Sequence, residues 1–179
     1  MYRMDRAARL IKTLVCKRSA DAPPFDPVRR RTRQPAYTAR HPRGMIDFNE
    51  RPFIVIWEVT QACDLACVHC RASAQSWRSP LELSIEAGKW LIDEAAALKI
   101  PVFVLTGGDP LKRPDTFDLV EYAAAQGVSV SLTPSTTPLL TNEAIARLKG
   151  SGLARLAISF DGPTAQVHDT FRRVPGSYD

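Results

Sequence analysis

With 179 residues, of which 45% are hydrophobic, the chain is long enough for one globular domain with a buried core. Its net charge of +5 is unevenly distributed, because residues 1–45 carry 12 Lys and Arg against three Asp and Glu, which leaves 12 against 16 for residues 46–179. The excess positive charge therefore lies in residues 1–45, and residues 46–179 are acidic overall. No apolar run reaches the length of about 20 residues that a transmembrane helix needs.

The first 48 residues have a composition that cannot bury a core. They include five prolines, the arginine-rich run at residues 29–33, and few large apolar residues after Val15. We expect residues 1–48 to be a mostly disordered basic leader, although residues 5–15 also fit a short basic amphipathic helix of the kind that lies on anionic membranes. The arginine run lacks interleaved aromatic residues, so no nucleic-acid partner is expected. No signal-peptide pattern opens the sequence, which predicts a cytoplasmic protein.

Residues 49–179 alternate between strand-like and helix-like segments. Nearly continuous apolar runs, typical of strands buried on both faces, occur at residues 53–59, 101–106, 128–133 and 155–160. The helix signals between them are Ser84 as an N-cap, Pro114 in a first turn, Thr141 as a further N-cap, and Gly127 and Gly150 as the ends of the second and third helices.

This alternation, with connections too long for hairpins, predicts a parallel sheet with helices packed outside it. The pattern fits either a doubly wound sheet or a barrel, and both place the chemistry at the carboxyl ends of the strands. Polar or glycine-bearing segments do follow all four predicted strands, at residues 60–70, 106–110, 133–137 and 159–163. We therefore expect one functional rim.

Three cysteines, Cys63, Cys67 and Cys70, lie in the first of these segments. Without a signal peptide, such clustered thiols indicate metal binding rather than disulfides. A closed zinc site wants four ligands, and His69 is too near Cys70 in the chain for both to reach one tetrahedral ion. Three thiolates can instead ligate three irons of a [4Fe–4S] cluster and leave the fourth iron open. A zinc site completed by a distant residue and a nucleophilic thiol are the alternatives.

The C-x-x-x-C-x-x-C spacing after a first apolar strand resembles the signature of radical S-adenosylmethionine (SAM) enzymes. The similarity runs from about residue 52 to residue 178. It points to the branch with a C-terminal auxiliary-cluster extension (SPASM or twitch), which includes peptide-maturing and haem or haem d1 biosynthesis proteins. It implies an α/β fold, a partial (β/α)6 TIM-like barrel of about four βα units, with residues 49–179 as a truncated core domain.

The resemblance implies two cofactors, a [4Fe–4S] cluster on the three cysteines and SAM. The implied SAM-binding residues are Thr106, Gly107, Gly108, Asp109, Thr133, Ser159 and Arg172. In the glycine segment, which lets a ligand approach the backbone, Asp109 replaces the family's Glu as partner of the SAM amino group. Arg172 suits the SAM carboxylate because a guanidinium binds carboxylates bidentately. Asp161 is expected to shape its turn or to orient Arg172.

The implied activity is reductive cleavage of SAM to a 5′-deoxyadenosyl radical, followed by hydrogen abstraction from a peptide or tetrapyrrole-type substrate. No catalytic residue is expected beyond the cluster ligands. The expected partners are an electron donor such as flavodoxin or ferredoxin and a complementary C-terminal half. Because such cores usually have six βα units, the alternative is a non-catalytic truncated fragment or split-gene subunit that keeps only cluster or metal binding.

Overall fold

The computed structural model describes Phe48 and residues 51–179. The predicted leader, apart from Phe48, and the amphipathic-helix alternative at residues 5–15 lie outside the described residues. Within the described part of the chain, no helix is both long and apolar enough to cross a membrane.

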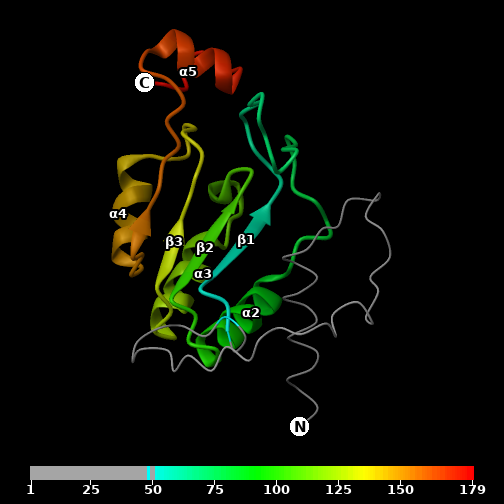
Figure 1. Cartoon of the computed structure of the whole chain (residues 1–179), viewed down its shortest axis with the longest axis vertical. Coiled ribbons are helices and arrows are strands. Elements are labelled where there is room, and N and C mark those ends of the chain that lie inside the picture. The colour runs from blue at the N-terminus through cyan, green and yellow to red at the C-terminus, as the bar shows by residue number, and fades with distance from the viewer. Residues whose placement is uncertain (1–47, 49–50) are drawn as a thin grey trace, which may run out of the picture. The chain divides into compact units, whose positions relative to one another are not determined.

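Four parallel strands form one sheet, as the alternating pattern predicts (Figure 1). The strands are β1 (Ile54–Thr60), β2 (Val102–Gly107), β3 (Val130–Leu132) and β4 (Arg155–Leu156), and they lie in the order β1-β2-β3-β4. In register, Glu58 pairs with Thr106 and Thr60 pairs with Gly107, so the predicted cysteine and glycine segments leave the sheet side by side.

Helices follow the strands, and their bounds agree closely with the capping signals. They are α2 (Ile85–Ala97), the short 3-10 helix η2 (Pro110–Lys112), α3 (Thr116–Ala125), α4 (Asn142–Gly150) and α5 (Ala165–Arg172). The Ser84 and Thr141 hydroxyls each accept a backbone N–H of the first turn, which confirms both N-caps.

Two details of the helix ends differ from the prediction. Pro114 lies before α3, whose N-cap is Asp115, because the backbone at this point is still turning out of η2. Gly150 is the last residue of α4 rather than its stop. Gly152, with a φ of +84°, takes the left-handed conformation that lets the chain leave the helix.

The core lies on one face of the sheet. Val55, Trp57 and Val59 of β1 point toward it and pack with residues of α2, α3 and α4. The alternate β1 residues Ile54 and Ile56 are 43% and 49% exposed. Sequential strand order with core helices on one face is the arrangement of a barrel segment, whereas a doubly wound sheet reverses its strand order and covers both faces.

The fourth strand is much shorter than the predicted run at 155–160. One further bond, from Ala157 N to Leu132 O, continues the pairing. Beyond it the chain loses its partner, because β3 ends at Leu132 and the backbone turns away at Thr133-Pro134. Residues 157–160 are consequently exposed and outside the sheet.

Candidate functional site

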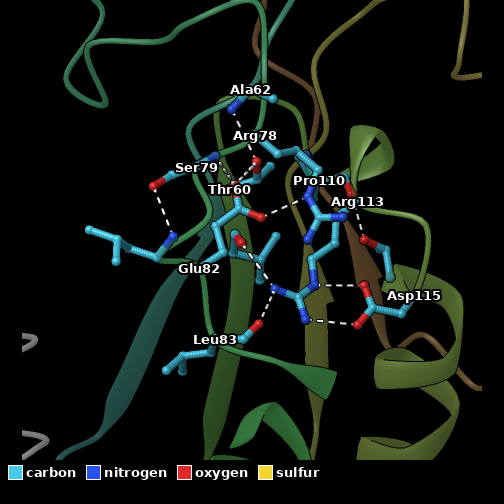
Figure 2. A network of polar contacts seen from close by, with 12 residues as sticks. Thr60, Ala62, Arg78, Ser79, Glu82, Leu83, Pro110, Arg113 and Asp115 are labelled. Atoms are coloured by element: carbon cyan, nitrogen blue, oxygen red, sulfur yellow. Dashed lines mark hydrogen bonds and ion pairs between the residues drawn. The ribbon is translucent and has the colours of Figure 1, made fainter. Parts of the chain in front are cut away.

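The cysteine loop, residues 61–81, leaves β1 and returns toward α2, and a polar network closes it at its base (Figure 2). Thr60 Oγ1 donates to Glu82 Oε1 at 2.5 Å, and Arg78 Nε donates to Glu82 Oε2 at 2.7 Å. Burial raises the pKa of Glu82, but the bonds from Thr60 and Arg78 outweigh it and hold that pKa below its usual value. The carboxylate thus joins the two ends of the loop.

Arg113 also connects the two ends of the cysteine loop. Its side chain is buried, and Nη1 donates to the carbonyl oxygens of Leu83 at 2.7 Å and Val59 at 3.4 Å. Nη2 donates to Asp115 at 2.7 Å, and the guanidinium lies 5.5 Å from the ring centre of Trp57. Backbone on both sides of the cysteine loop therefore shares one cation (Figure 2).

The three cysteine sulfurs each accept an N–H hydrogen bond. The donors are Leu65 N for Cys63 at 3.4 Å, Arg172 Nη1 for Cys67 at 3.4 Å, and Ala74 N for Cys70 at 3.3 Å. Such donors stabilise thiolates and are a recognised feature of metal-bound sulfur. All three cysteines are free thiols in the structure.

Among the described residues, no three His, Cys, Asp or Glu side chains converge to hold a single metal ion. A zinc site completed by a distant residue therefore stays an untested alternative. In a cubane each thiolate binds its own iron, so convergence on one ion is not what a cluster requires.

The glycines that follow β2 permit close contact between two backbones. A Cβ on Gly107, whose φ is +151°, would collide with Thr60 O, and one on Gly108 would lie 2.6 Å from Gln61 O. Gly108 N donates to Thr60 O at 2.8 Å, so the glycine segment is attached to the start of the cysteine loop. Neighbouring backbone by itself therefore requires glycine at both positions, and their contact with SAM stays a prediction.

Asp109 is fully buried, and both carboxylate oxygens have protein partners. Oδ1 accepts Leu111 N at 3.0 Å, and Oδ2 accepts the Thr137 hydroxyl at 2.7 Å. Burial raises the pKa of Asp109, and these hydrogen bonds oppose the shift without cancelling it. The carboxylate therefore ties the β2 segment to the β3 segment, and its assignment to the SAM amino group stays a prediction.

Ser135 links the same two segments to the first cysteine. Its Oγ donates to Gly108 O at 3.0 Å and lies 3.3 Å from Cys63 Sγ. Ser135 thus connects the glycine segment directly to Cys63. The sequence offered no signal for this contact, because it joins segments 72 residues apart.

The last turn of α5 holds the centre of the cysteine loop. Ala66 N donates to Arg172 O at 3.1 Å and Val68 N donates to Phe171 O at 3.0 Å. The Phe171 ring lies 4.5 Å from that of His69. Arg172 also pairs with Asp161 at 2.5 Å, in agreement with the interpretation that Asp161 orients Arg172.

The other predicted SAM-binding residues make fewer hydrogen bonds within the protein. Thr106 and Thr133 are half-buried at the ends of β2 and β3, and Thr133 N donates to Leu105 O. Ser159 is exposed, and no described residue hydrogen-bonds its hydroxyl. The structure thus brings the cysteine, glycine and β3 segments and Arg172 together, whereas Ser159 stands apart from these contacts.

Comparison with known proteins identifies the family. The model of the radical SAM superfamily matches residues 57–179. An AdoMet-dependent heme synthase of Nitratidesulfovibrio vulgaris is 42% identical over 142 residues, which cover 79% of this chain and 38% of that protein. The mycofactocin maturase MftC of Mycobacterium tuberculosis is 39% identical over 130 residues, covering 73% and 32% of the two chains.

A solved structure supports the fold. Streptococcus suis SuiB bound to S-adenosylmethionine superposes with a TM-score of 0.61 at 13% identity, covering 70% of this chain and 29% of that one. The chain spans between about a third and two fifths of the length of these sequence relatives. Its family model, its fold and its cysteine spacing agree, and the chain belongs to the radical SAM superfamily.

Proposed function

We propose that residues 49–179 form a partial radical SAM core that binds a [4Fe–4S] cluster through Cys63, Cys67 and Cys70, and binds SAM beside it. Proteins of this superfamily use both cofactors. The proposed activity is reductive cleavage of SAM and hydrogen abstraction from a peptide or tetrapyrrole-type substrate. The carrying observation is that three cysteine sulfurs at the end of β1 each accept an N–H.

The residues fit both groups chemically. Thiolates carry negative charge, and the N–H donors to the sulfurs offset it. For SAM, Arg172 supplies a second sign of fit, because its Nε is buried and lacks an acceptor among the described residues. A buried N–H without a partner is costly, and a ligand carboxylate would satisfy it.

When bound, the cluster supplies the electron that cleaves SAM to methionine and a 5′-deoxyadenosyl radical. The protein's own task is to hold and orient. The Thr60–Glu82 contact and Arg113 fix the base of the cysteine loop, and α5 fixes its centre. We assign Thr106, Gly107, Gly108, Asp109, Thr133, Ser159 and Arg172 to SAM as in the sequence prediction.

Turnover needs partners that the described residues do not supply. We propose an electron donor such as flavodoxin or ferredoxin, and a complementary C-terminal half that covers the sheet face bearing Ile54 and Ile56, which is exposed among the described elements. A cytoplasmic location is part of this proposal, because clustered free thiols need a reducing compartment.

The test is anaerobic reconstitution of the full chain with iron and sulfide, followed by iron analysis and EPR of the reduced form with and without SAM. We expect about four irons per chain, a spectrum that SAM changes, and loss of the iron in Cys67→Ala. Cys16→Ala is the matched control, since it removes a thiol outside the predicted triad, and it should keep the iron.

One zinc per chain with no effect of SAM would overturn the proposal. A loaded cluster that binds SAM but releases no 5′-deoxyadenosine with dithionite would support the fragment alternative instead. If cleavage occurs, the substrate class follows from a second assay. Deuterium transfer into 5′-deoxyadenosine from a labelled iron coproporphyrin indicates a tetrapyrrole, and transfer from a labelled precursor peptide indicates a peptide.

A further inference from the structure

Arg172 makes an unusual set of contacts for a residue assigned to a SAM carboxylate. It is 8% exposed, and its guanidinium is shared between two protein groups. Nη1 donates to Cys67 Sγ at 3.4 Å, and Nη2 lies 2.5 Å from Asp161 Oδ2. One edge of the cation therefore faces a proposed cluster ligand, and the other faces a carboxylate.

The main chain fixes this geometry. The residues on either side of Cys67 are bonded to the end of α5, Ala66 N to Arg172 O and Val68 N to Phe171 O. Cys67 and the Arg172 side chain thus belong to one rigid contact, and the approach of the guanidinium to the sulfur follows from how α5 docks. Asp161 then restricts the guanidinium's rotation.

A cation at a ligand sulfur has a definite electrostatic effect. Hydrogen bonds to the sulfurs and the net charge near a cluster are among the determinants of its reduction potential. Reduction adds an electron, so a nearby positive charge favours the reduced form. The low exposure of Arg172 limits screening by solvent and salt.

We propose that Arg172 is a positioning residue that raises the reduction potential of the cluster by donating to Cys67 Sγ, with Asp161 holding the cation and partly offsetting its charge. This role rests on the proposed cluster at the three cysteines. This role is separate from any contact between Arg172 and SAM. Nη1 and Nη2 contact protein groups, whereas Nε has no acceptor among the described residues.

The experiment is an EPR-monitored redox titration of the reconstituted full chain without SAM, which removes any SAM-binding role from the readout. Arg172→Gln should shift the midpoint potential to more negative values at unchanged iron content, and Arg172→Lys should give a smaller shift. Asp161→Asn should shift it to more positive values, because the cation loses its counter-charge. The two substitutions therefore have opposite expected signs.

Arg173→Gln is the matched control. Arg173 is the next residue in the chain, it is exposed, and it loses the same charge without touching the cysteine loop in the described contacts. Its midpoint potential should equal that of the wild type. A similar negative shift in Arg173→Gln would mean that overall charge, not the Cys67 contact, controls the potential, and the proposal would fail.

Iron content separates this proposal from the proposed function. A wild-type chain that takes up no cluster would overturn both the proposed function and the role of Arg172. If the Arg172→Gln and Asp161→Asn chains bind the cluster but keep the wild-type potential, only the role of Arg172 is overturned. If Arg172→Gln does not load iron, Asp161→Asn decides alone, and a potential that fails to rise overturns the inference.

Discussion

Two arginines, Arg113 and Arg172, are buried among the described residues, and they differ in how completely protein groups surround them. At the base of the cysteine loop, Arg113 is surrounded by backbone carbonyls, Asp115 and the Trp57 ring. At the rim, Arg172 has one carboxylate, one cysteine sulfur, and an Nε without an acceptor in the described structure.

This difference in surroundings distinguishes an arginine that stabilises the fold from one that can bind a ligand. Arg113 Nε also lacks an acceptor in hydrogen-bond geometry, but it lies 2.7 Å from Asp115 Oδ1, so each nitrogen of this guanidinium faces a protein oxygen. A buried cation surrounded in this way contributes to stability and has no donor directed at a ligand. A buried N–H with no acceptor nearby costs free energy unless a ligand or water satisfies it, which makes Arg172 a candidate functional residue. The base of the loop is therefore expected to respond to substitution in stability, and the rim in cofactor properties.

The largest effect is expected at the base. Arg113→Met leaves Asp115 without its counter-ion and two carbonyls without a donor, which should lower the free energy of unfolding by about 3 kcal/mol. Arg147→Met, at an exposed pair with Asp118 at 3.8 Å, should cost under about 1 kcal/mol. Denaturant unfolding measures both. Equal losses, or a changed cluster potential in folded Arg113→Met, would contradict the distinction.

A glycine pair tests the junction between base and rim. Gly108→Ala places a methyl group against Gln61 O and Ala62 O, so the start of the cysteine loop must move. We expect a loss of about 2 kcal/mol in unfolding free energy and a lower iron content. Gly150→Ala meets no atom within 4 Å at the end of α4, and should be neutral or stabilising. Full iron in Gly108→Ala would show that the contact is dispensable.

The smallest effect concerns Asp109, a rim residue whose carboxylate is enclosed like Arg113. Burial raises the pKa of Asp109 above its ordinary value of 3.8. The folded state therefore binds the proton more tightly than the unfolded state, and wild-type stability is lost as the pH rises from 3.8 through the folded pKa.

Asp109→Asn removes this dependence, so the variant should gain stability relative to the wild type as the pH is raised from 3.5 to 7 in urea unfolding experiments. Thr137→Val removes the donor that favours the carboxylate and should steepen the wild-type trend. If loaded Asp109→Asn instead loses its response to SAM at constant stability, Asp109 belongs with Arg172 as a cofactor contact.

Local patterns predicted the elements well, because their causes are local. The Ser84 and Thr141 caps and the alternation of strand and helix depend on neighbours a few residues away. The three cysteines were identified from their spacing alone, and their role as cluster ligands stays a prediction. The early end of β4 was not predicted, because it depends on the partner strand β3, which stops at Leu132.

The contacts that give the site its character were not predictable in this way. The burial of Arg113 and the bond from Arg172 to Cys67 join residues far apart in the chain, 105 positions in the second case. They depend on how strands register and helices dock. For the same reason the sequence did not reveal that backbone of the neighbouring loop lies against Gly107 and Gly108. Their contact with SAM stays a prediction.

The docking of α5 on the cysteine loop also sets an order of events during synthesis. A ribosome releases the cysteines long before it releases Phe171 and Arg172, whose carbonyls accept the N–H groups of Val68 and Ala66. Until then the loop lacks the partners that shape its middle. The nascent chain therefore presents its three thiols in a loop that lacks these two bonds until α5 has been made.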